Sequence, residues 1–422
     1  MEVEVKFKSL GIKPNEVYVL ACSYGPDSMC LFDLLLKNEV KFVVAHVNYH
    51  KRKEAGEEER ALRRYCDQNK VPFYFKGTHY QKRYGNFQSW AREVRYKFFQ
   101  EIYENLNADG LFIAHQEDDV IETYMIQIQR DVQVFNYGLL EETSILSMRV
   151  LRPLLENTKK QIMEYCALNS VPFAVDSSNK TPVYTRNRIR IDVVSQMSPE
   201  ERQKVLEEIS KKNKELLDRK SQLDKEFSPY GFLELGKILH LPDNDLYYVL
   251  YKMTTQYIPP RKFDQKTFKD IKKLLVSQKP NSKLSLSSTA WLMREYGKIY
   301  VANFKALKPY LITVPNPQKL TTPYLVLRLT GDLSNLNITH ADFPLTIRSS
   351  HAKDAYRIKD YSVQVRRLFI DWKMPSCLRI IWPVIINNKN QIIYIPRYRA
   401  DYVSNGTSAI DVLSPHLITA KK

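Results

Sequence analysis

The sequence VYVLACSYGPDS at residues 17–28 joins an apolar run to a short polar loop. We expect a buried strand over Val17–Cys22 and a helix over Asp27–Lys37, with the loop at their junction. The N–H groups of a helix start and the positive end of its dipole meet at such a junction, where they suit a phosphate group. The hydroxyls of Ser23 and Ser28 add two donors, so the segment predicts a phosphate-binding loop.

Asp27 is the loop residue that does not suit phosphate, because a carboxylate repels it. A carboxylate at this position is useful if it binds a cation such as Mg²⁺ or helps to cap the helix. The alternative interpretation of the whole loop is a plain turn with a helix cap. The loop is not a Walker A motif, since it contains no Gly-Lys-Ser or Gly-Lys-Thr.

Short apolar runs and amphipathic stretches alternate through the first part of the chain. After the first helix we expect strands and helices in turn at Lys41–Asn48, Glu54–Asn69, Pro72–Phe75, Phe87–Tyr103, Leu111–Ala114 and Asp118–Gln129. This alternation is typical of a Rossmann-like α/β fold, a parallel sheet with helices on both faces. Such sheets bind ligands at the carboxyl ends of their strands.

A histidine and three acids follow the fourth predicted strand: His115, Asp118, Asp119 and Glu122. Asp118 and Glu122 are four residues apart, so they share one face of the helix, where like charges repel in the absence of a cation. Together with Asp27 they are candidates to hold Mg²⁺ next to a bound phosphate group. The alternative is an acidic helix start that the helix dipole stabilises.

Two further positions carry candidate chemistry. His46 ends the second predicted strand, which should neighbour the first, so it is expected near the loop; the alternative is a histidine satisfied at a strand end. The segment RNRIR at residues 186–190 places three arginines within five residues. Fixed cations that close together need an anionic partner, phosphate or carboxylate, unless they form a solvated basic turn.

Composition limits the class of protein. A chain of 422 residues predicts two or three domains. Its 64 Lys and Arg against 47 Asp and Glu give a net charge of +17, which favours a nucleic-acid partner. Five cysteines without a C-x-x-C pair argue against a disulfide framework and favour a reducing cytoplasm. We see neither a secretory signal nor an apolar run long enough to span a membrane.

The character of the sequence changes near residue 198. Ser198, Pro199 and Glu201 form a helix-start signature, and a long charged helix with a solvated basic face is expected to follow. Further on, Tyr247–Met253 and Phe268–Leu275 have helical patterns, whereas the last part of the chain is rich in short β-type runs. We predict a catalytic domain, a linker helix, a mainly helical middle domain and a small α+β domain at 1–197, 198–228, 229–341 and 342–422.

The loop resembles the S-G-G-x-D-S loop of the ATP pyrophosphatase (PP-loop) family. Members of that family cleave ATP between the α- and β-phosphates and form an adenylated intermediate. This chain departs from the pattern at Tyr24, where the family has a glycine that tolerates a positive φ and a close phosphate. Pro26 occupies the variable position, where its fixed φ suits a helix start.

Further motifs are similar to those of the tRNA(Ile)-lysidine synthetase family. These are H-x-[ND]-H-x-x-R, A-R-x-x-R-Y, A-H-x-x-D-D-x-x-E-T, R-P-L-L, D-x-S-N and R-N-x-[IV]-R, at residues 46–52, 91–96, 114–123, 152–155, 176–179 and 186–190. One departure is Tyr49, which stands where the family usually has a second histidine. A weaker similarity to the family's C-terminal domain covers residues 345–348, 365–375 and 382–384.

The resemblance implies a reaction and its participants. The family uses ATP to join L-lysine to C2 of the wobble cytidine in a tRNA(Ile) with the anticodon CAU, so a cytoplasmic enzyme with Mg²⁺ and tRNA-binding middle and C-terminal domains is expected. The implied catalytic residues are Asp27, His115, Asp118, Asp119 and Glu122. The implied ATP-binding residues are Ser23, Tyr24, Gly25, Pro26, Asp27, Ser28 and His46. The implied metal ligands are Asp27 and Asp118, and the implied RNA or nucleotide contacts are Arg92, Arg95, Arg186 and Arg190.

Two rival functions stay open at this point. One is another PP-loop enzyme that modifies tRNA or forms an amide. The other is a catalytically silent RNA-binding protein that keeps the fold, which the departures at Tyr24 and Tyr49 favour. The oligomeric state is also open, with a homodimer among the options.

Overall fold

A computed structural model describes residues 3–398 and 410–412 without residues 4, 6, 8, 9, 14, 51–53, 82–85, 131, 132, 175–184, 229, 256–262, 280, 322–324, 331–337 and 359. The chain forms two compact units, Met1–Leu216 and Leu217–Lys422. The predicted D-x-S-N motif at 176–179 and the end of the first histidine motif at 51–52 lie outside the described residues.

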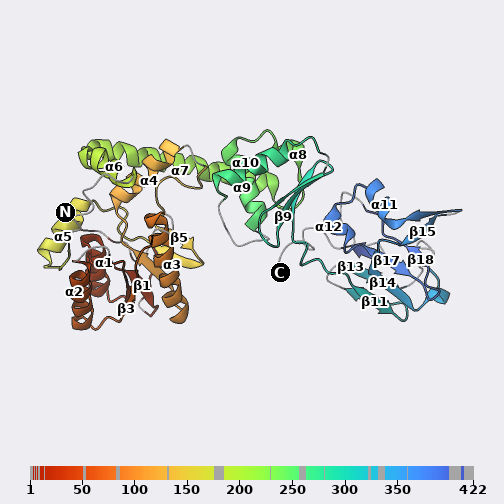
Figure 1. Ribbon diagram of the computed structural model, residues 1–422, viewed down its shortest axis with the longest axis horizontal. Coiled ribbons are helices and arrows are strands. Elements are labelled where there is room, and N and C mark those ends of the chain that lie inside the picture. The colour runs from red at the N-terminus through yellow and green to blue at the C-terminus, as the bar shows by residue number, and fades with distance from the viewer. Residues whose placement is uncertain are drawn as a thin grey trace. The chain divides into compact units, whose positions relative to one another are not determined.

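A six-stranded sheet forms the centre of the first unit (Figure 1). Its strands, in order across the sheet, are β3 (Phe73–Gly77), β2 (Phe42–Asn48), β1 (Tyr18–Ala21), β4 (Gly110–Ile113), β6 (Met148–Leu151) and β5 (Glu142–Ile145). Only β5 runs antiparallel to its neighbour in this sheet. The predicted parallel sheet, and the predicted pairing of its first two strands, are therefore confirmed.

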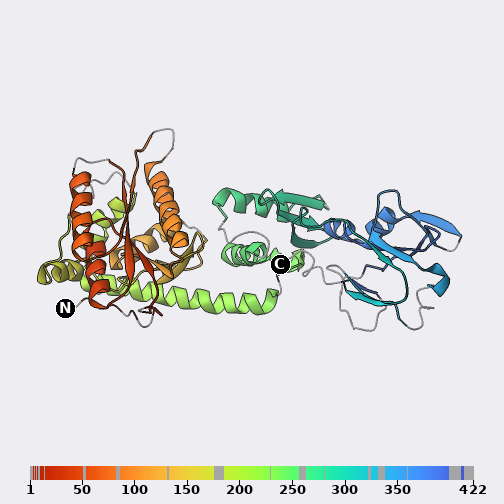
Figure 2. The same ribbon diagram turned by 90° about the horizontal axis from the view of Figure 1, so that it is seen from below.

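Helices cover both faces of this sheet, as predicted. In Figure 2 the red helix α1 and the orange helix α3 lie on opposite sides of the strands. The helices α1 (Pro26–Lys37), α2 (Ala55–Gln68) and α5 (Lys159–Leu168) share one core with alternate residues of the strands, whereas α3 (Phe87–Asn105) packs on the opposite face. Tyr18 and Leu20 of β1 belong to the first core and Val19 to the second, because successive side chains of a strand alternate between faces.

The order of the strands reverses between β1 and β4. From β1 the chain continues to β2 and β3 on one side, and it then returns to build β4 and β6 on the other side. In an open parallel sheet, the loops that leave two such strands separate and open a crevice at their carboxyl ends. The helix α4 (Glu117–Arg130) follows β4 directly, so it begins at this crevice.

The remaining elements of the first unit form a helical layer. They are α6 (Thr185–Asp192), the 3₁₀ turn Val194–Gln196 and α7 (Pro199–Phe227), which continues past Leu216 into the second unit. The predicted helix start is confirmed: the Ser198 N–H donates to Glu201 Oε2 at 2.8 Å, and the Glu201 N–H donates to Ser198 Oγ at 3.2 Å. Ile209 of α7 is buried against Val120 and Tyr124 of α4.

The second unit begins with a mixture of helices and strands. Its helices are α8 (Leu235–Ile238), α9 (Asp243–Thr255) and α10 (Gln265–Leu275). The last two contain the helical patterns predicted from the sequence. A four-stranded antiparallel sheet accompanies them, with the order β7 (Leu233–Glu234), β10 (Lys298–Ala302), β9 (Trp291–Glu295) and β8 (Asn281–Ser285).

The end of the chain is rich in short strands, as predicted. One sheet has the order β11 (Leu311–Val314), β14 (Leu345–Ser349), β17 (Pro383–Ile386) and β18 (Ile392–Tyr394). The others contain β12 (Lys319–Thr321), β13 (Leu325–Arg328) and β19 (Ile410–Val412), and β15 (Ala355–Ile358) and β16 (Tyr361–Gln364). The helical elements are the 3₁₀ turn His340–Asp342, α11 (Val365–Asp371) and α12 (Ser376–Arg379).

The first of these sheets bears on the predicted domain limits. β11 lies before the predicted border at 341/342 and β14 lies after it, yet the two strands pair. The four domain limits stay a prediction. Within the described residues, no helix is both long and apolar enough to cross a membrane.

Tyr24 is the loop residue with an unusual backbone. Its φ is +65°, in the left-handed region where a side chain costs about 1–2 kcal/mol and glycine costs little. We expect Tyr24→Gly to be more stable than Tyr24→Ala by about 1 kcal/mol, because both variants lose the same ring and only glycine relieves the backbone. Urea-induced unfolding of the two variants measures this difference.

Tyr65 supplies the matched control for this comparison. It lies in the helix α2, and its half-buried ring packs against the same core as the ring of Tyr24. In the helix the usual order should hold, with Tyr65→Ala about 1 kcal/mol more stable than Tyr65→Gly. The same order at position 24 would show that the loop carries no backbone strain.

Candidate active site

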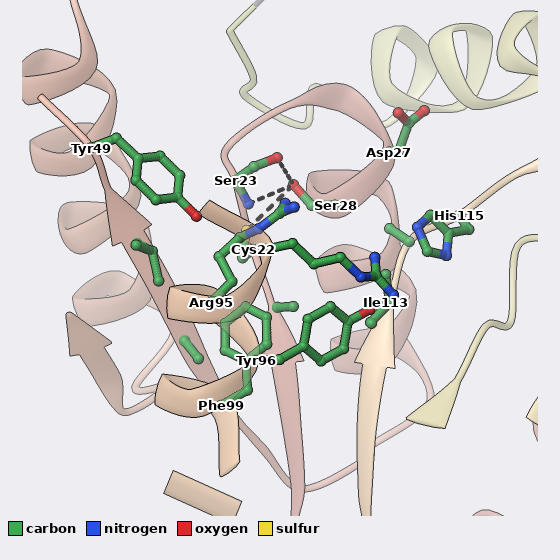
Figure 3. Close-up of a pocket in the computed structure, with 15 residues that line it drawn as sticks. Cys22, Ser23, Asp27, Ser28, Tyr49, Arg95, Tyr96, Phe99, Ile113 and His115 are labelled. Carbon is green, nitrogen blue, oxygen red and sulfur yellow. Dashed lines mark hydrogen bonds between the residues drawn. The ribbon is translucent and has the colours of Figure 1, made fainter. Parts of the chain in front are cut away.

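A cavity of about 250 Å³ opens at the carboxyl ends of β1, β2 and β4, on the side of the sheet that α3 covers. Its lining residues are Ala21, Cys22, Ser23, Asp27, Ser28, Ala45, Val47, Tyr49, Arg92, Arg95, Tyr96, Phe99, Ile113, Ala114 and His115. Three residues of the predicted loop, Ser23, Asp27 and Ser28, therefore line one cavity with the predicted His115, whereas Tyr24, Gly25 and Pro26 are not among its lining residues. Figure 3 shows Arg95 extending from α3 toward Ser23 and Ser28, with His115 and Asp27 across from Tyr49.

Ser28 organises the loop. Its hydroxyl donates to the Gly25 carbonyl at 3.0 Å, and its oxygen accepts the Ser23 N–H at 3.3 Å (dashed lines in Figure 3 mark the bonds between the residues drawn). Gly25 is the residue before the helix and makes no side-chain cap, and Pro26 begins α1 as predicted. The first N–H groups of a helix have no partner within the helix, so this end of α1 offers donors and a positive dipole end to a ligand.

Asp27 forms an ion pair with a lysine of the same chain. Its Oδ1 lies 2.7 Å from Nζ of Lys159, the first residue of α5. Burial raises the pKa of the Asp27 carboxyl above its ordinary value, and Lys159 opposes that shift. The prediction that this acid needs a cation is thus met in part by a lysine that the motif analysis missed. The available signal was the capping box at residues 158–161, which places Lys159 at a helix start.

His46 does not line the cavity. Because side chains alternate along β2, Ala45 and Val47 face the cavity and His46 faces the opposite side, where it stacks near Phe73 and Phe75. Its Nδ1 lies 2.8 Å from the Cys22 carbonyl, and burial lowers its pKa. This geometry matches the alternative of a satisfied histidine, one that steadies the end of β1. A contact between His46 and ATP stays a prediction.

His115 lines the cavity and is held by the R-P-L-L motif. Nε of Arg152 donates to His115 Nδ1 at 3.0 Å, and Nη1 of Arg152 donates to the Leu140 carbonyl at 2.7 Å. Burial lowers the pKa of His115 to about 4, so the ring is neutral near pH 7. Arg152 is itself buried, and its contact with the histidine was not predicted from the sequence.

Arg92 and Arg95 reach the cavity from α3, as the resemblance implied. Within the described residues neither guanidinium forms an ion pair; Arg92 lies over the ring of Tyr96, with 4.5 Å between Cζ and the ring centroid. Tyr49 also lines the cavity, and its hydroxyl donates to the Ala91 carbonyl at 2.8 Å, which ties β2 to α3. The two arginines give the cavity fixed positive charge beside the loop.

The predicted acids after His115 are bound by arginines. Nε of Arg186 lies 2.7 Å from Glu122 Oε2, and Nη2 of Arg186 lies 2.7 Å from Asp119 Oδ1. Arg190 donates to the same two carboxylates, including Oε1 of Glu122 and, at 3.3 Å, Oδ1 of Asp119. Glu122 is fully buried. The anionic partner that the R-N-R-I-R segment required is therefore, in this state, carboxylate.

Asp118 has a different partner. Nη1 of Arg202, in α7, lies 2.5 Å from Asp118 Oδ1 and 3.1 Å from Glu117 Oε1. Asp118 and Glu122 are four residues apart but face different arginines, and neither lines the cavity. Arg202 also departs from the solvated basic face expected of α7, since its side chain is only 19% exposed.

No group of three or more His, Cys, Asp or Glu side chains within the described residues is arranged to hold a metal ion. Binding of Mg²⁺ by Asp27 and Asp118 stays a prediction. Helical spacing showed which acids share a turn, but it could not show which distant arginines reach them.

The neutral state of His115 predicts a pH dependence of stability. The unfolded chain binds a proton with a pKa near 6.5 and the folded chain only near 4, so between these values the unfolded state binds more protons. The contribution of the neutral His115 ring to the free energy of unfolding is complete above about pH 6.5 and is lost as the pH falls toward about 4. His115→Gln should flatten this fall in the free energy of unfolding, measured by urea titration at several pH values. The exposed His240, changed to Gln, is the control, and an unchanged slope in His115→Gln would contradict the assignment.

The chain is similar to known proteins along most of its length. The PP-loop domain family matches residues 1–197. The tRNA(Ile)-lysidine synthase of Mycoplasma mycoides subsp. mycoides SC is 29% identical, over 90% of this chain and 97% of that protein. The enzyme of the same name from Staphylococcus aureus (strain COL) is 27% identical over 93% and 95% of the two chains, and that of Ureaplasma parvum serovar 3 is 36% identical over 42% and 54%.

Among solved structures, a U34-tRNA thiolase from Methanococcus maripaludis covers 49% of this chain and 76% of its own, with 15% identity and a TM-score of 0.41. The similarity in sequence to the synthases runs through both units of the chain, and the PP-loop match covers the whole sheet that carries the cavity. The chain therefore belongs to the tRNA(Ile)-lysidine synthase family of PP-loop proteins.

Proposed function

We propose that this chain joins L-lysine to C2 of the wobble cytidine in a tRNA(Ile) with the anticodon CAU. ATP first adenylates the cytidine oxygen and releases pyrophosphate, and the lysine ε-amine then displaces AMP to give lysidine. The observation that carries the proposal is the cavity between β1 and β4, where a phosphate-type loop faces two arginines that form no ion pair with a described residue. The similarity to the synthases along both units supports the choice of substrate.

The cavity suits a nucleotide in two ways. The start of α1, the hydroxyl of Ser23 and the guanidinium of Arg95 offer donors and positive charge to phosphate oxygens. Val47, Ile113 and Phe99 give the same cavity apolar walls, which suit the flat face of a base. Adenylation turns a poor leaving oxygen into a good one, and fixed donors around the α-phosphate stabilise the charge that develops there.

Magnesium fits this donor set as an ion that arrives with ATP. Asp27 is the one carboxylate among the described residues that line the cavity. Mg²⁺ at nucleotide sites is commonly held by one or two carboxylates together with phosphate oxygens, so Asp27 would hold it and Asp118 is the second predicted ligand. When bound, the ion would neutralise charge on the transferred phosphates.

The acids and arginines beyond His115 form a site of mixed charge. We assign Asp119 and Glu122 to the amino groups of the incoming lysine, and Arg186 and Arg190 to RNA or nucleotide phosphates. Since these four side chains pair with one another in the described state, binding of lysine and RNA exchanges internal ion pairs for ion pairs with substrates. His115 remains neutral at pH 7, so it can orient a substrate group by a hydrogen bond without adding charge.

The target cytidine has to leave its stack to reach a cavity of this kind. We assign the cytoplasm as the place of the reaction, because its tRNA substrate is there. A homodimer stays a prediction.

The second candidate function is that of a silent RNA-binding protein. It is favoured by Tyr24, whose φ of +65° is strained for a tyrosine.

Incubation with ATP, labelled lysine and a tRNA(Ile) bearing CAU tests the reaction. We expect label in the RNA, together with AMP and pyrophosphate. Asp27→Ala should lose ATP–pyrophosphate exchange and labelling while keeping its circular dichroism spectrum, because the cavity then lacks its carboxylate. ATP turnover without labelled RNA would support another PP-loop ligase. RNA binding without ATP turnover would support the silent module.

Binding of tRNA should weaken steeply with salt, because the net charge of +17 attracts a polyanion whose counterions are released on binding. For roughly 6–10 phosphate contacts, affinity falls about 10³- to 10⁵-fold between about 50 and 200 mM salt. Filter binding over this range measures the slope. Asp27→Ala should keep the wild-type slope, and a flat response of the wild type would exclude the basic surface as the RNA footprint.

A further inference from the structure

Lys159 lies beside the cavity but belongs to no motif that the sequence identified. Its Nζ is 2.7 Å from Oδ1 of Asp27, and its side chain is 41% exposed. An ammonium group has three donors. Asp27 takes one of them, so the group keeps two donors for other partners next to Asp27, which itself lines the cavity.

The position of Lys159 in its helix is electrostatically unfavourable. It is the first residue of α5, where the dipole favours anions and disfavours cations by a few tenths to about 1 kcal/mol. Thr158 fixes this helix start, because its hydroxyl accepts the Gln161 N–H at 3.2 Å and its N–H donates to Gln161 Oε1 at 2.8 Å. A cation at a helix start needs a compensating anion. Asp27 balances the charge of the Lys159 ammonium, but it does not also balance the positive end of the helix dipole.

A purely structural role for the pair explains little. The two side chains are 41% and 30% exposed, and ion pairs with this much solvent add little to stability. The helices α1 and α5 already share a buried apolar core that includes Cys30, Leu34, Ile162 and Cys166. Packing therefore holds the two helices together without the ion pair, which leaves Lys159 available for a ligand.

A triphosphate at the loop would face the carboxylate of Asp27, and the two negative charges repel. We propose that Lys159 is a phosphate-contacting residue of the ATP site, whose ammonium bridges the Asp27 carboxylate and a phosphate oxygen of ATP. This inference deepens the proposed function and rests on its ATP-binding step. In this proposal Lys159 of α5 adds to the positive charge that Arg92 and Arg95 of α3 bring to the cavity.

The test measures the dissociation constants of ATP with Mg²⁺ and of adenosine alone by calorimetry, with no RNA or lysine present. Lys159→Met should weaken ATP binding about 10- to 100-fold, the loss expected for one charged hydrogen bond. It should leave adenosine binding within about twofold, because adenosine has no phosphate. Lys159→Arg should restore most of the ATP affinity.

Lys160 provides the matched control, since it is the next residue of the same helix start and its side chain is 81% exposed. Lys160→Met should bind ATP as the wild type does. Wild-type ATP affinity in Lys159→Met, or an equal loss for ATP and adenosine, would overturn the inference. Because the assay needs no lysine transfer, a chain that binds ATP but labels no RNA would refute the proposed reaction and leave the role of Lys159 intact.

Discussion

The parallel pairing of β1 with β4 places the whole candidate site. Tyr18–Ala21 pair in register with Gly110–Ile113, so both strands end at the same edge and the residues after them meet there. This pairing depends on Gly110, because a Cβ at that position would lie 2.9 Å from side-chain atoms of both Tyr18 and Leu151. Contacts that short essentially do not occur, so a side chain at this position would force Tyr18 and Leu151 to move.

Charged side chains near this edge of the sheet are balanced around α4 but not at the cavity. Away from the cavity, acids and arginines neutralise one another, and the fully buried Glu122 is paired with two arginines. At the cavity, two arginines face the phosphate loop with no ion pair to a described carboxylate, and the single lining acid, Asp27, is matched by Lys159. The cavity therefore carries a local excess of positive charge, which suits a polyanionic ligand, whereas the acids of α4 are balanced by arginines.

Sequence periodicity was sufficient to predict the strands β1 to β4 and the helices α1 to α4 that alternate with them, but not β5 and β6. The strand β5 is short, polar and partly exposed, so it has no apolar run that would reveal it. The position of the loop followed from the same pattern. The partners of the site residues could not be predicted in this way: Asp27 and Lys159 are 132 residues apart, and Asp118 and Arg202 are 84 apart. Local spacing fixes the face of a helix but not which distant side chain meets it. A similar limit applies to His46 in a strand. Side chains alternate between the two faces of the sheet, so a shift of one residue along the strand decides whether a side chain faces the cavity.

The two departures from the family pattern have different consequences in three dimensions. Tyr24 adopts the backbone that a glycine would take, and its ring packs against the core that α1 and α2 share, outside the residues that line the cavity. Its carbonyl also accepts the Ala174 N–H at 2.9 Å, which fixes the loop. Tyr49 does line the cavity, but its hydroxyl is bonded to α3. Tyr24 thus costs backbone energy without occupying the space for a phosphate. The strain that favoured a silent module is therefore compatible with a loop that keeps the shape for ATP.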